Sequence, residues 1–120
     1  KALSGLLLDL EVRGLLKETI VVLTSEFGRT PNINPRDGRD HWPYYYTAFL
    51  AGGAIKGGTS FGDTDEIGRN LSKDKPVKPE DLNATLAYAL GLPLNDVQYS
   101  PSGRPFTVAH NGDPVQEVLS

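Results

Sequence analysis

The first group of side chains that could do chemistry follows a short apolar run, Thr19–Thr24. Glu26 is the first carboxylate after that run, and a charged group at the end of a buried strand needs a metal, an arginine or solvent as its partner. Arg29 lies close enough along the chain to pair with Glu26. The sequence therefore leaves two interpretations of Glu26 open: a metal ligand, or half of an ion pair that anchors the loop.

The second group is Arg39, Asp40 and His41, directly before Trp42. Aspartate and histidine both supply ligand atoms to metals, and a carboxylate can also orient an imidazole. Adjacent residues on an extended segment point to opposite sides, so we expect only one of Asp40 and His41 to contact a bound ligand directly. The alternative is a packed, hydrogen-bonded histidine beside Trp42 that binds no metal.

The composition indicates a globular piece of modest size. The chain has 120 residues, of which 38% are hydrophobic and 22% charged, and its net charge is −3. Its scattered basic residues do not indicate nucleic-acid binding, and no apolar stretch is long enough to span a membrane. The absence of cysteine excludes disulfides, thiolate metal sites and cysteine nucleophiles. Because the chain begins at Lys1 and contains no methionine, we expect a processed or truncated piece.

These groups must be positioned by the elements on either side of them. Apolar periodicity and turn residues predict helices over residues 2–17 and 79–90, strands over 19–24, 45–51 and 104–108, and a helical turn over 115–119. Gly91 stands where a helix C-cap is expected. A helix followed by a continuous apolar strand is typical of half a βαβ unit, so we expect residues 19–24 to form a central parallel strand covered on both faces.

Several motifs along the chain resemble the domain-of-unknown-function 1501 family: SEFGRTPNIN, GRDHWP, AFLAGGAIKGG, GDTDEIG and PEDLNATLAYALGLP. The resemblance extends over nearly the whole chain. That family is sometimes labelled sulfatase-like and is similar to a branch of the alkaline phosphatase superfamily, which includes sulfatases. The resemblance implies an α/β fold, with residues 1–120 as a single partial domain: the C-terminal part of an alkaline-phosphatase-like α/β/α sandwich with a mostly parallel sheet.

The resemblance also implies a function and a set of ligands. The intact protein would be a bacterial, exported protein that hydrolyses or binds a sulfate or phosphate ester of a small molecule or glycan. It would use a divalent metal (zinc, manganese or calcium), with Glu26, Asp40 and His41 as ligand candidates. Arg29 and Arg39 would hold the anionic group, because guanidinium groups pair well with such oxyanions.

The resemblance places no catalytic residue in this segment. The nucleophile and further acidic ligands would precede Lys1, so neither Ser25 nor Thr30 is a candidate nucleophile. We therefore expect the segment to need the N-terminal part of the same protein as its partner, and to hydrolyse nothing alone.

Phe27 is the main departure from the superfamily pattern. The superfamily has Asp-His where this chain has Glu26-Phe27, and a phenylalanine cannot bind a metal. This difference favours a rival interpretation, in which the protein is a non-catalytic binding or surface protein on a degenerate fold. A third possibility is a proteolytic remnant without a function of its own.

Overall fold

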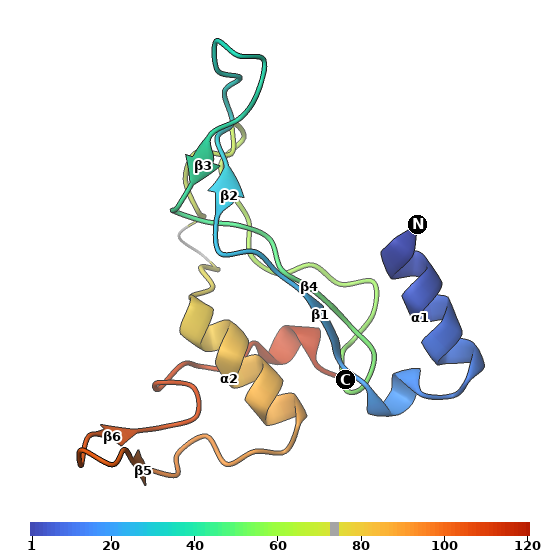
Figure 1. The fold of residues 1–120 in the computed structure, drawn as a ribbon, viewed down its shortest axis with the longest axis vertical. Coiled ribbons are helices and arrows are strands. Elements are labelled where there is room, and N and C mark those ends of the chain that lie inside the picture. The colour runs from blue at the N-terminus through green and yellow to red at the C-terminus, as the bar shows by residue number, and fades with distance from the viewer. Residues whose placement is uncertain (73–74) are drawn as a thin grey trace. The chain divides into compact units, whose positions relative to one another are not determined.

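The computed structural model describes residues 1–72 and 75–120, and the chain divides into two compact units (Figure 1). The first unit comprises Lys1–Gly53 and Phe61–Pro76, and the second comprises Ala54–Ser60 and Val77–Ser120. In the first unit the elements are α1 (Ala2–Val12), the 3₁₀ turn η1 (Leu16–Glu18), β1 (Val21–Leu23), β2 (Gly28–Arg29), β3 (His41–Trp42) and β4 (Phe49–Ala51). In the second unit they are α2 (Pro79–Ala89), β5 (Gln98–Tyr99), β6 (Pro105–Phe106) and the 3₁₀ turn η2 (Gln116–Val118).

The predicted sandwich with a mostly parallel sheet is wrong, because the described strands form three antiparallel pairs: β1 with β4, β2 with β3, and β5 with β6. The reason lies in the connection between β1 and β4. A parallel neighbour requires a crossover, usually a helix, whereas the segment between these strands contains only the β2–β3 hairpin. The chain therefore returns alongside β1 in the opposite direction, with Val22 paired to Leu50.

The predicted burial of the first strand on both faces is not seen in the described residues either. Val22 is 39% exposed and Leu23 is 55% exposed. An apolar run of this length predicts a strand, but it determines neither the direction of the neighbouring strand nor what covers the faces. The predicted first helix is also shorter than expected: α1 ends at Val12, and Gly14 with a φ of +72° precedes the 3₁₀ turn.

The second unit is organised around α2, whose predicted position is confirmed to within one residue at its C-terminus. Pro79 occupies the first turn and Gly91 follows the helix with a φ of +71°. Its inward face carries the small residues Ala84, Thr85 and Ala87, all of them buried. Within the described residues no helix is long and apolar enough to cross a membrane.

Candidate functional site: the β2–β3 hairpin

The β2–β3 hairpin brings together the two groups of side chains in Ser25–Trp42. Its register pairs Gly28 with Trp42 and Arg29 with His41, and the Thr30 N–H donates to the Asp40 carbonyl at 3.0 Å. Successive side chains of a strand point to opposite faces. We call the side that carries Phe27, Arg29 and His41 the histidine face, and the side that carries Gly28, Thr30, Asp40 and Trp42 the tryptophan face.

Gly28 is required by the close approach of the chain that follows the hairpin. A Cβ at this position would collide with the carbonyl oxygen of Tyr45. Only glycine lets the backbone of β2 pass so close to that carbonyl. The glycine of the EFGRTP motif therefore has a packing role in shaping the site.

The histidine face is an aromatic and cationic stack. The rings of Phe27 and His41 are stacked, with centroids 3.9 Å apart and an interplanar angle of 25°. The guanidinium carbon of Arg29 lies 5.2 Å from the centroid of the Phe27 ring, and Arg29 Nη1 donates to the Arg39 carbonyl at 3.3 Å. Phe27 thus positions both polar side chains of this face.

Glu26 does not pair with Arg29. Glu26 is exposed. The single ion pair in the described part of the chain joins Arg13 and Asp9. The cation of Arg29 is directed to the Phe27 ring and a carbonyl instead. The interpretation of Glu26 as half of a loop-anchoring ion pair with Arg29 is therefore wrong for this structure.

Arg39 stabilises the loop between the two strands. Its Nη1 donates to the carbonyl oxygens of Thr30, at 2.7 Å, and Pro31. A guanidinium that spans two backbone carbonyls fixes the start of the loop. Arg39 therefore helps to hold the loop in place, and anion binding by Arg39 stays a prediction.

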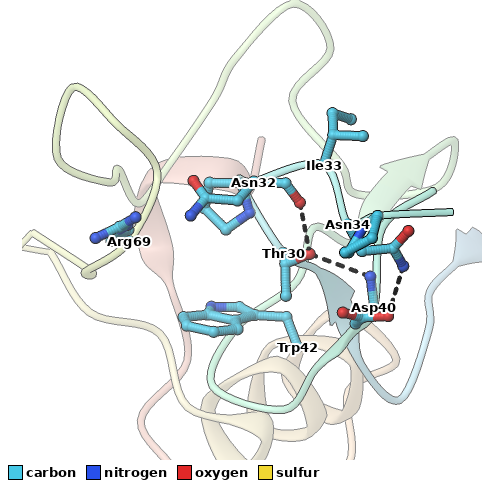
Figure 2. A pocket seen from close by; sticks show the side chains of 9 residues that line it. Thr30, Asn32, Ile33, Asn34, Asp40, Trp42 and Arg69 are labelled. Atoms are coloured by element: carbon cyan, nitrogen blue, oxygen red, sulfur yellow. Dashed lines mark hydrogen bonds between the residues drawn. The ribbon is translucent and has the colours of Figure 1, made fainter. Parts of the chain in front are cut away.

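The remaining loop is organised by Asn34. Its side-chain oxygen accepts the N–H groups of Arg36, at 2.9 Å, and Gly38, at 3.1 Å, while its amide nitrogen donates to Asp40 Oδ1 at 2.8 Å (Figure 2). Asp40 is consequently held on the tryptophan face, and His41 stacks on the other. The expectation that these adjacent residues point to opposite sides matches this arrangement.

The tryptophan face carries a cleft of about 460 Å³, lined by Thr30, Pro31, Asn32, Ile33, Asn34, Pro35, Asp40, Trp42 and Arg69 (Figure 2). The indole Nε1 of Trp42 is buried and has no hydrogen-bond partner in the part of the chain that the structure describes. An unpaired buried donor costs about 1–3 kcal/mol. A water, an ion or a ligand that supplies an acceptor there would remove this cost.

Arg69 reaches this cleft from a turn that the sequence analysis did not connect with the hairpin. The Asp65 carboxylate accepts the N–H of Arg69 at 2.6 Å and the side-chain amide of Asn70 at 2.7 Å. These bonds, the one from Arg69 first, hold the pKa of Asp65 below its ordinary value of 3.8. Tyr45 also donates its hydroxyl to the Gly68 carbonyl, which ties the turn to the segment after β3.

The three predicted metal ligands do not form one site on their own. Asp40 lies on the tryptophan face and His41 on the histidine face, so both cannot bind one ion in this arrangement. No group of three or more histidine or acidic side chains in the described residues could hold a metal ion. Metal binding by Glu26, Asp40 or His41 stays a prediction, and it would require ligands beyond these three.

A protein-family model described as "Protein of unknown function (DUF1501)" matches residues 1–119 of the chain. No curated protein and no solved structure matches the chain. The family prediction from the sequence motifs is confirmed. The wider likeness to sulfatases and alkaline phosphatases has no support from these comparisons.

Proposed function

Because the chain belongs to the DUF1501 family of proteins of unknown function, its role must be argued from the site, and we propose that the histidine face binds the oxyanion of a sulfate or phosphate ester. The ester would belong to a small molecule or a glycan. The observation that carries the proposal is the position of Arg29, which lies against Phe27 and opposite His41.

Arg29 is partly immobilised before any ligand arrives. One of its nitrogens donates to a backbone carbonyl, and the ring of Phe27 supports the guanidinium. Its other N–H groups have no acceptor among the described residues, so they can donate to the oxygens of an ester group. A preorganised guanidinium loses less side-chain entropy on binding than a mobile one.

His41 can donate a hydrogen bond to the same oxyanion as Arg29. It is the cross-strand partner of Arg29, and its stacking on Phe27 keeps the imidazole on the same face as the guanidinium. An imidazole N–H donates to an oxyanion in either protonation state. The two side chains together supply donors of the kind that a tetrahedral oxyanion accepts.

The geometry supports binding more than hydrolysis. Thr30 is engaged in the loop, because its hydroxyl donates to the Asn32 carbonyl at 3.0 Å and accepts the Asp40 N–H at 3.1 Å. Both bonds hold Thr30 in the loop, and we propose no nucleophilic role for it. Hydrolysis would need a nucleophile that the histidine face does not supply.

The test uses 4-nitrophenyl sulfate and 4-nitrophenyl phosphate, whose binding is measured by calorimetry and whose hydrolysis is followed as release of 4-nitrophenol. Zinc, manganese and calcium are each added in separate runs. Arg29→Gln removes the cation, and Arg104→Gln is the control, since Arg104 is an exposed arginine of the other unit.

We expect the wild-type protein to bind at least one ester without turnover, and Arg29→Gln to bind it about tenfold more weakly, the loss of one exposed charge-assisted contact. Failure of the wild type to bind either ester, or equal binding by Arg29→Gln, would refute the proposal. Metal-dependent release of 4-nitrophenol would establish a hydrolase instead of a binding protein.

A further inference from the structure

The cleft on the tryptophan face is separate from the proposed ester site. Trp42 and His41 are adjacent in β3 and project to opposite faces of the hairpin. The cleft volume of about 460 Å³ is within the range of about 300–1,000 Å³ that small-molecule sites occupy. The cleft can therefore hold its own ligand, whether or not the histidine face binds an ester.

The walls of the cleft combine apolar and polar surface. Pro31, Ile33, Pro35 and Trp42 supply the apolar part. Trp42 also makes edge contacts with Tyr44 and Tyr45, with centroids 4.9 Å and 6.2 Å away, which hold the indole in place. An aromatic ring bordered by polar groups suits a sugar, because the C–H face of a pyranose packs on the ring while its hydroxyls form hydrogen bonds.

The polar groups differ between the two sides of the cleft. In Figure 2, Arg69 lies on one side of Trp42, and Asn34 and Asp40 lie on the other. Arg69 is exposed and has no acidic partner in the described part of the chain. One oxygen of Asp40 accepts from Asn34, and its second oxygen remains for a ligand hydroxyl.

The indole N–H of Trp42 is a further donor without a partner in residues 1–72 and 75–120. Asn32 also lines the cleft and is exposed. A ligand oxygen that reaches the indole N–H would satisfy it. A sugar acid or a sugar sulfate carries all three groups that the cleft can bind: an acceptor for Trp42, an anion for Arg69 and a hydroxyl donor for Asp40.

We propose that this cleft binds an acidic saccharide. The pyranose ring packs against Trp42, its carboxylate or sulfate pairs with Arg69, and its hydroxyls donate to Asp40. Hydrogen bonds of Asn34 and Arg39 already hold the loop that lines the cleft.

The test compares D-glucuronate, glucose 6-sulfate and glucose as ligands of the full protein. Affinity is measured by calorimetry, and the indole N–H resonance of Trp42 is followed by NMR, with its assignment taken from Trp42→Phe. Arg69→Gln removes the cation of the cleft. Arg36→Gln is the matched control, since Arg36 is an exposed arginine of the same loop that does not line the cleft. Amide spectra of each variant verify that the fold is kept.

We expect at least one acid to bind and to shift the Trp42 resonance, and glucose to bind at least tenfold more weakly. Arg69→Gln should lose at least tenfold in affinity, whereas Arg36→Gln should stay within twofold of the wild type. Binding of only one acid identifies the preferred anion. The proposal is overturned if neither acid binds, if glucose binds equally well, or if the loss follows Arg29→Gln and not Arg69→Gln.

Discussion

Replacing Thr85 by valine removes a hydroxyl that connects α2 to the C-terminal segment while keeping the shape of the side chain. Thr85 is only 1% exposed. Its Oγ1 donates to the Asp81 carbonyl at 2.6 Å and accepts the N–H of Val115 at 2.9 Å. In Thr85→Val the Val115 N–H loses its acceptor in a partly buried place, which costs about 1–3 kcal/mol in the free energy of unfolding.

Urea unfolding followed by circular dichroism measures this cost. Because m-values of small proteins are about 1–3 kcal/mol/M, a loss of about 2 kcal/mol lowers the midpoint by roughly 1 M. Thr85→Ser is the control: it keeps the hydroxyl and loses one methyl group, so its destabilisation should be smaller. If Thr85→Val were as stable as the wild type, or more stable than Thr85→Ser, the hydroxyl bridge would not hold the segment.

Three further predictions concern two glycines of the second unit, the Asp65 turn and the loop of the hairpin. Gly112→Ala should strongly destabilise the second unit, because a Cβ there would collide with the Glu80 carbonyl. Gly57→Ala should be nearly neutral for stability, because no atom lies within 4 Å of a Cβ at that position. Thermal melts of both variants check this. The depressed pKa of Asp65 means that its carboxylate stabilises the turn fully above its ordinary, unfolded pKa of 3.8. This effect is lost as the pH falls through the lower folded pKa. The Arg69 amide resonance should therefore titrate with a midpoint below 3.8. A midpoint at or above that value, or an unchanged titration in Asp65→Asn, would contradict the assignment. Arg39→Gln should loosen the loop, seen as faster amide hydrogen exchange there, and unchanged exchange would show that its two carbonyl contacts are dispensable.

The local elements follow from the sequence where one residue has a strong local preference. Pro79 at the start of α2 and Gly91 after its end mark a helix that the structure confirms. The alternation of side chains along a strand is a local rule, and it is enough to predict that Asp40 and His41 point to opposite faces. These features depend on neighbours in the chain and need no knowledge of distant contacts.

Sequence reasoning fails where long-range contacts decide the outcome. The apolar run over residues 19–24 indicates a strand, but the antiparallel partner Phe49–Ala51 depends on how the intervening hairpin returns the chain. Arg69 enters the cleft through the Asp65 turn, and no pattern links that turn to Trp42. The Asn34 turn was detectable, because an asparagine before Pro-Arg-Asp-Gly is a common turn former.

The measurement that tests the central claim most directly is an NMR titration of the protein with 4-nitrophenyl sulfate and phosphate, following the Nε–H resonance of Arg29 and the ring resonances of His41. The site on the histidine face predicts that both sets of resonances shift together and saturate at one ligand concentration. If both stay unchanged up to saturating ligand, or if only arginines outside the hairpin respond, the histidine face does not bind the ester.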